Sequence, residues 1–288
     1  MYRLKYINIL CLLLVLYSCE EKGVVIDFDD SIKEDTTYVT TPETAQAKTV
    51  LIEEFTGVSC PPCPGGHDAV KAIKVQHTNR IVVIANHILN FPQADPIKNL
   101  SKQDFRTQDA TDIGNAIYQG ISQMPLAGID RTPVTGQMLL TRTLWANAVN
   151  ERINKLSYLN INMTSVYDPA LKEATVKVKI AFTQAVSKKL CLHIAVIEDS
   201  IIDAQKNQLT IDTFYTHNYV LRDVISPLNG IPFLDDISTK EAGRVYERTV
   251  KFNLNDLWNV GKCKVVAYVS VNEAPKVEVL QSAWMKLN

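Results

Sequence analysis

Two cysteines separated by two residues are the groups in this sequence whose type and spacing most directly indicate chemistry. They lie in the run Cys60-Pro61-Pro62-Cys63. At the start of a helix, the positive end of the helix dipole favours a cysteine thiolate, which is the attacking species in disulfide exchange. We therefore expect Cys60 to be the nucleophile and Cys63 to close or open the disulfide. The prolines lack amide donors, so we expect weaker amide stabilisation of the Cys60 thiolate than in a motif with fewer prolines.

The elements around this motif indicate an α/β unit. Residues 48–56 form a strand candidate, 67–77 carry apolar residues at helical spacing, and 80–88 are a β-branched run typical of a buried strand. Strand, Cys-x-x-Cys, helix and strand in this order open a thioredoxin-like fold. A second helix over 143–156 is expected to close the unit. The sequence therefore predicts a thioredoxin-like domain over residues 48–157.

Two further residues are candidates for the catalytic site. Pro125 enters a short strand well after the cysteines, and it resembles the cis-proline that faces the cysteine pair in thioredoxin folds. A plain turn proline is the alternative. Glu54 lies before the motif and resembles the buried proton-accepting acid of thioredoxins. The adjacent Glu53 competes for that assignment, and a solvated carboxylate at the strand edge is at least as plausible.

Histidines near the motif have weaker signals. His67 follows the cysteines on the expected helix, where it either stabilises a thiolate or is exposed. His87 ends the second strand, where active-site groups gather in α/β folds. A zinc site needs about four ligands, and the sequence places only Cys60, Cys63 and His67 near one another. Zinc is therefore the least favoured reading, and we expect no cofactor.

From residue 158 the helical pattern gives way to short alternating strands. This pattern predicts an antiparallel, immunoglobulin-like β-sandwich over residues 158–288. A long irregular connection is expected over 199–240. The expected strands are 158–166, 175–183, 190–198, 245–253, 262–271 and 277–286.

Cysteines outside the motif also need an assignment. Cys191 and Cys263 fall in two of the expected strands. They either form a disulfide across the sandwich or remain two separate buried thiols. We favour separate thiols, because a disulfide requires a specific geometry.

The N-terminus has the features of an export signal. Arg3 and Lys5 precede an apolar run over 7–17, which is too short to span a bilayer but fits a signal peptide. The run ends at Ser18-Cys19, which resembles the lipobox of bacterial lipoproteins. Residues 1–18 are thus expected to be removed, and a lipid on Cys19 would anchor the protein without spanning the membrane. An ordinary signal peptide or membrane anchor with a chance cysteine is the alternative.

Composition narrows the classes of partner. Residues 19–47 are polar and acidic and are expected to form a flexible tether. The formal net charge is −1, and nothing in the sequence indicates the basic stripe of a nucleic-acid-binding protein. We therefore expect no nucleic-acid partner. Export places the cysteines where disulfides persist.

Three segments carry a resemblance to a known family. The run 53–57 leads into the cysteine motif and His67; 217–222 and 277–281 are further landmarks. Together they resemble the outer-membrane-protein-28-related lipoproteins of Bacteroidetes type. This resemblance implies a thioredoxin-like domain followed by a β-sandwich, and an outer-membrane location. It implies no settled biochemical activity.

Two functions follow from these observations. The first is thiol-disulfide exchange on exported proteins that carry thiols or disulfides, by a lipid-anchored outer-membrane protein. The second is a surface binding or adhesion lipoprotein, in which the cysteines form a structural disulfide and the partner is an extracellular ligand. The acidic pair Glu20-Glu21 next to Cys19 resembles surface-export signals, so the cell surface is a possible destination in either case.

Overall fold

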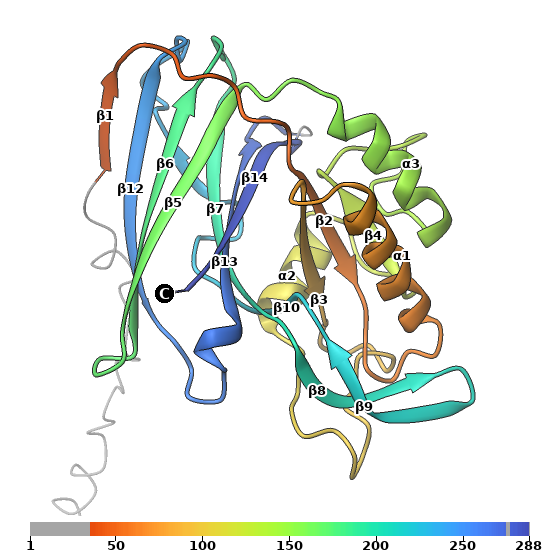
Figure 1. Ribbon diagram of the computed structural model, residues 1–288. Coiled ribbons are helices and arrows are strands. Elements are labelled where there is room, and N and C mark those ends of the chain that lie inside the picture. The colour runs from red at the N-terminus through yellow and green to blue at the C-terminus, as the bar shows by residue number, and fades with distance from the viewer. Residues whose placement is uncertain (1–34, 275–276, 288) are drawn as a thin grey trace, which may run out of the picture. The chain divides into compact units, whose positions relative to one another are not determined.

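The computed structural model describes residues 35–274 and 277–287, and Figure 1 shows their arrangement. The leader and Cys19 lie outside the described residues. The first part of the described chain contains β1 (Asp35–Val39), β2 (Val50–Phe55), α1 (Cys63–Gln76), β3 (Ile81–Asn86), α2 (Gln108–Ala116), β4 (Leu126–Ile129) and α3 (Arg142–Ile153). The remainder contains β5 (Leu159–Asp168), β6 (Glu173–Phe182), β7 (Leu190–Glu198), β8 (Ile201–Asn207), β9 (Thr210–His217), β10 (Val220–Val224), β11 (Ile231–Phe233), β12 (Arg244–Asn253), a 3₁₀ turn (Val260–Lys262), β13 (Cys263–Val271) and β14 (Val279–Lys286).

The predicted elements around the cysteines are present. The apolar runs form β2 and β3, which are buried along their whole length and pair in parallel. Helix α1 tolerates Pro64 because the first turn of a helix does not need its amides. It buries Val70 and Ile73 against the sheet, in a cluster with Trp145 of α3. The strand, Cys-x-x-Cys, helix and strand order is therefore confirmed.

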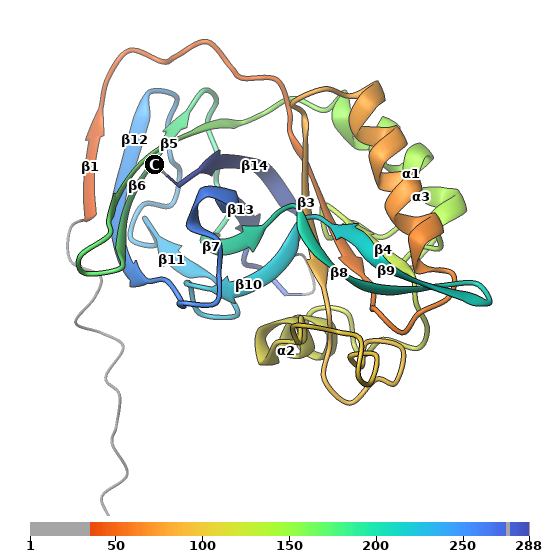
Figure 2. The same cartoon turned by 60° about the horizontal axis from the view of Figure 1, so that its bottom comes forward.

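One mixed sheet contains strands from both predicted domains. Its order is β14-β13-β7-β10-β3-β2-β4, with β11 added beside β7. Val220 of β10 pairs in parallel with Ala85 of β3, which joins the two halves within the sheet. Figure 2 shows β10 and β3 next to each other, where strands of the two predicted domains meet. All described residues belong to one compact unit. That residues 48–157 and 158–288 fold separately stays a prediction.

A second sheet covers one end of the first. It has the antiparallel order β1-β12-β6-β5. Its inner side chains, such as Val176, Val178 and Ile180, share an apolar cluster with Ile194 and Val265 of the mixed sheet. All six strands expected in this half are present within a few residues. The antiparallel part of the fold prediction is thus confirmed, whereas an immunoglobulin-like topology stays a prediction.

Two segments differ from the expected irregular structure. Residues 35–39, in the expected tether, form the edge strand β1 paired with β12, where Asp35 contacts Arg248 at 2.8 Å. The expectation of an irregular connection over 199–240 was wrong for much of that segment, because it contains the β8–β9 hairpin, β10 and β11. The inward side chains of β8 include Asp203 and Gln205, so the apolar alternation that marks a strand is missing there.

Cys191 and Cys263 are separate buried thiols, as expected. They lie on the neighbouring strands β7 and β13, but Cys263 is opposite Glu198 and Cys191 is opposite Ser270. Seven residues of strand separate the two positions, about 23 Å at the usual rise. A disulfide needs Cα atoms within about 7 Å, so this register excludes the pairing.

A buried ionic network joins the two halves of the chain. Lys48 contacts Asp130 at 2.9 Å and donates to the carbonyl oxygen of Val279 at 3.1 Å. Asp130 also accepts from Arg152 at 3.1 Å, and Arg152 reaches Glu278 at 2.6 Å. Burial lowers the pKa of Lys48, and the attraction of Asp130 acts in the opposite direction. The start of β2 is thereby fixed to the start of β14.

Candidate functional site

Cys60 and Cys63 form a disulfide with Cα atoms 5.4 Å apart. Cys60 precedes the helix and Cys63 is its first residue. The amide of Cys63 donates to the carbonyl of Cys60 at 3.3 Å, and the amide of Gly65 donates to the carbonyl of Pro62 at 3.1 Å. The amides of Cys63 and Gly65 therefore bond carbonyls of the same turn in the disulfide-bonded form. Weak amide stabilisation of a Cys60 thiolate stays a prediction.

Both cysteines are enclosed. Each has a relative exposure of 0%, and both belong to an apolar cluster with Phe55, Ala94 and Met124. An exposed Cys60 beside a shielded Cys63 is the arrangement usual for a disulfide oxidoreductase. The disulfide-bonded form differs from it, because residues distant in sequence cover the turn.

Two segments make this cover. On one side, the amide of Ser59 donates to the carbonyl of Gln93 at 3.0 Å, and its hydroxyl donates to the carbonyl of Asp95 at 2.6 Å. On the other side lies the β8–β9 hairpin. The amide of Lys206 donates to the carbonyl of Val58 at 2.8 Å. The turn that carries the disulfide is thus bonded to both neighbours through its backbone.

Glu54 is the buried acid nearest the helix start. It is 2% exposed, and its Oε1 has no hydrogen-bond partner among the described residues. Burial alone raises the pKa of Glu54 to about 8. A Cβ added to Gly66, in the first turn of α1, would lie 2.7 Å from Oε1 of Glu54. Glycine at position 66 therefore allows this carboxyl to approach the turn that contains Cys63.

The adjacent Glu53 points to the opposite side of β2 and has a different environment. Its carboxylate accepts from Arg131 at 2.8 and 2.9 Å and from the hydroxyl of Tyr118 at 2.6 Å. Arg131 in turn donates to Tyr268 of β13 at 2.8 Å. Glu53 is thus neutralised by a buried guanidinium, which leaves Glu54 as the unpaired acid of the two.

Pro125 lies on the same side as Glu54. Its peptide bond with Met124 is cis. A Cβ on Gly66 would meet Cβ of Pro125 at 3.0 Å, so the ring packs against the first turn of α1. The expected proline is therefore next to the helix that begins with Cys63, and next to Glu54.

His67 connects α1 to the β8–β9 hairpin. Its Nε2 lies 2.9 Å from the hydroxyl of Thr56, and its Nδ1 lies 2.7 Å from the hydroxyl of Tyr215 in β9. Burial, with a smaller contribution from His217, lowers the pKa of His67 to about 3. His67 is therefore neutral at ordinary pH and holds the hairpin through a hydrogen bond rather than a charge.

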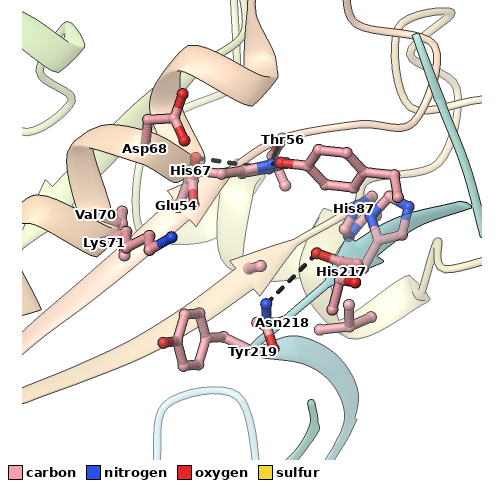
Figure 3. Close-up of a pocket in the computed structure, with 14 residues that line it drawn as sticks. Glu54, Thr56, His67, Asp68, Val70, Lys71, His87, His217, Asn218 and Tyr219 are labelled. Atoms are coloured by element: carbon pink, nitrogen blue, oxygen red, sulfur yellow. Dashed lines mark hydrogen bonds and ion pairs between the residues drawn. The ribbon is translucent and has the colours of Figure 1, made fainter. Parts of the chain in front are cut away.

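A cavity of about 460 Å³ opens beside these residues, between α1, the ends of β2 and β3, and β9. Figure 3 shows His87 and His217 on one side of it and Glu54 and His67 on another. His87 is buried and neither ring nitrogen has a partner among the described residues. Burial lowers the pKa of His87 to about 3 and that of His217 to about 4. The cysteines do not line this cavity.

The sequence placed Glu54, Pro125, His67 and His87 near the motif, and the structure brings the first three to the start of α1. Nothing in the sequence indicated Gln205 and Tyr215, because the β8–β9 hairpin itself was not expected.

Within residues 35–274 and 277–287, no group of three or more His, Cys, Asp or Glu side chains is arranged to hold a metal ion. No helix in the described part of the chain is long and apolar enough to cross a membrane.

Comparisons with known proteins agree with this architecture. A family model described as outer membrane protein Omp28 matches residues 115–288, which excludes the cysteine motif. No curated protein matches the chain. HBP35 of Porphyromonas gingivalis is similar in structure, with a TM-score of 0.66 and 17% identity over 85% of this chain and 77% of that one. A protein from Agrobacterium tumefaciens has a TM-score of 0.52 and 13% identity, over 85% and 97% of the two chains. At these identities the likeness concerns the fold alone.

Proposed function

Because the chain belongs to the Omp28 family of outer membrane proteins, we propose that it is an envelope protein that exchanges disulfides with exported proteins through Cys60 and Cys63. In the oxidising direction, a substrate thiolate attacks Sγ of Cys60. The Cys60–Cys63 bond breaks and Cys63 leaves as a thiolate, which takes a proton from Glu54. A second substrate thiolate displaces Cys60, so the substrate dithiol loses two electrons and this protein gains them.

The observation that supports exchange most strongly is the state of Glu54. A buried carboxyl with an oxygen that accepts no hydrogen bond costs stability, because its charged form is poorly solvated. A purely structural disulfide needs no such group. With its pKa raised to about 8, Glu54 can hold and release a proton near neutral pH, as general acid–base chemistry requires. Its place near Gly66 puts that proton at the helix turn that begins with Cys63.

A second candidate function is binding of an extracellular ligand, with the cysteines as a structural disulfide. The complete burial of Cys60 and Cys63 favours it. In this case the cavity beside His67 and His87 would be the recognition site. The two candidates make different predictions for cysteine variants.

Trapping of a mixed disulfide distinguishes the exchange function from the binding function. Cys63→Ala removes the resolving thiol, so the exchange protein should accumulate a covalent complex with an exported substrate. Cys60→Ala should trap none. Non-reducing electrophoresis of envelope fractions, with each band tested for loss on reduction, measures the outcome. Modest destabilisation by both variants without any complex would support the binding function instead.

The same proposal includes a lipid anchor on Cys19, outside the described residues. A small residue before this cysteine, directly after the apolar run, supports it. Cys19→Ala should abolish incorporation of a labelled fatty acid and release the protein from membranes, and unchanged labelling would contradict the anchor. Protease treatment of intact cells tests whether the pair Glu20-Glu21 directs the protein to the surface.

A further inference from the structure

The β8–β9 hairpin is bonded to the backbone of the turn that carries the disulfide, and its second strand is largely exposed. Its two strands pair with each other and with no other strand of the described chain. An isolated two-stranded hairpin is at best marginally stable in water. The position of the hairpin therefore depends on its contacts with the rest of the protein. In Figures 1 and 2 the hairpin extends away from the sheet, past the start of α1.

The base of the hairpin and the part beyond the base make different kinds of contact. At the base, Ile201 packs with Val58, Phe105 and Val220 in a small apolar cluster. The carboxylate of Asp203 accepts from the amides of residues 102 and 103. These contacts fix the base, which is the natural position of a hinge.

Farther along, the hairpin is held to the disulfide turn by hydrogen bonds. Nε2 of Gln205 donates to the carbonyls of Gly57 at 3.1 Å and Cys60 at 3.3 Å. The amide of Gln208 donates to the carbonyl of Pro61 at 3.2 Å. The hydroxyl of Tyr215 forms the bond with His67 already described.

The outer face of the hairpin has no apolar cover. Leu209 is 101% exposed and Phe214 is 78% exposed. Lifting the hairpin would break hydrogen bonds that water can replace. Only His217 is buried among the residues of β9, so moving this strand would uncover little apolar surface. Such segments open locally at a much lower free energy than the whole protein.

We propose that the β8–β9 hairpin is a lid that swings about its base to admit the attacking thiol to Cys60, with Gln205 and Tyr215 as its latches. This inference rests on the proposed exchange function, for which it supplies the missing access. It accounts for a disulfide that is fully buried although the carboxyl of Glu54 approaches the first turn of the helix that begins with Cys63.

Reduction of the oxidised full-length protein by a small phosphine or by dithiothreitol tests the lid. A gated disulfide should be reduced at a rate that levels off at high reductant concentration, with the same plateau for both reagents. At low concentration, Tyr215→Phe and Gln205→Leu should each speed reduction by about fivefold to tenfold, since each removes bonds of the closed state. Tyr38→Phe is the matched control, because the hydroxyl of Tyr38 bonds Glu247 far from the hairpin, and it should leave the rate unchanged.

A second control separates lid opening from global unfolding. Lys48→Met should destabilise the whole fold without touching the hairpin. If reduction speeds up in Lys48→Met in proportion to its lost stability, the disulfide is reached by global unfolding and the lid is wrong. Unchanged rates in both latch variants would also overturn it. If the latch variants behave as expected but Cys63→Ala traps no partner, the hairpin covers a structural disulfide, and the exchange function fails rather than the lid.

Discussion

Oε1 of Glu54 lies 4.0 Å from Nε2 of His67, at the outer limit of ion-pair distance. Burial raises the pKa of Glu54 to about 8 and lowers that of His67 to about 3. Both groups are therefore driven to their neutral forms. The His67 ring is already bonded to Thr56 and Tyr215, so the Glu54 proton remains available to the site.

The first prediction concerns Glu54 and stability at alkaline pH. The folded state keeps the Glu54 proton between the ordinary pKa of 4.5 and about 8, a range in which the unfolded chain has lost it. The contribution of Glu54 to stability is thus complete below pH 4.5 and is lost as pH rises through 8. The slope approaches about 1.4 kcal/mol per pH unit. Glu54→Gln should gain stability relative to the natural protein between pH 6 and pH 8, as measured by urea unfolding. Parallel profiles for the two proteins would contradict the assigned pKa.

The second prediction concerns His87 and acid. Its pKa is lowered from 6.5 to about 3, so its contribution to stability is complete above pH 6.5 and is lost as pH falls towards 3. His87→Asn should lose less stability than the natural protein between pH 6.5 and pH 4, by about 1.4 kcal/mol per pH unit at most. His77→Asn is a suitable control, because His77 is at the surface and bonds only the side chain of Asn150 among the described side chains. Equal losses in His87→Asn and the natural protein would refute this account.

The third prediction concerns the ionic network between the two halves. Lys48→Met leaves Asp130 buried with one cation fewer and removes the bond to the carbonyl of Val279. Loss of one partner from a buried pair costs about 3–5 kcal/mol. Lys251→Met removes an exposed contact with Glu173 and should cost about 0–1 kcal/mol. Similar midpoints of chemical unfolding for the two variants would show that the network does not join the halves.

Spacing and residue type named Cys60, Cys63 and Glu54 as candidates, because these residues lie on consecutive elements. The choice between Glu53 and Glu54 required Arg131, whose position is set by strand pairing and not by any nearby pattern.

The burial of the cysteines could not be predicted in full, because part of the cover is the β8–β9 hairpin, more than a hundred positions away in the sequence. Strand β8 faces inward with Asp203 and Gln205, and these polar side chains bond loop amides and carbonyls instead of packing in a core. A pattern of apolar alternation therefore could not reveal it. The pairing of β10 with β3 could not be predicted either. A strand as short as β10 can pair with several sheet edges, and its own sequence does not indicate which one.

The fourth prediction concerns the reduction potential of the Cys60–Cys63 pair, which tests the claim that this pair exchanges disulfides. Equilibration of the full-length protein against dithiothreitol or glutathione buffers, with alkylation to count free thiols, measures it. If the pair exchanges disulfides with exported proteins, its potential should lie well above about −300 mV, within the range of about −270 to −120 mV found for disulfide oxidoreductases. A potential below about −300 mV would mark a structural disulfide and would contradict the account.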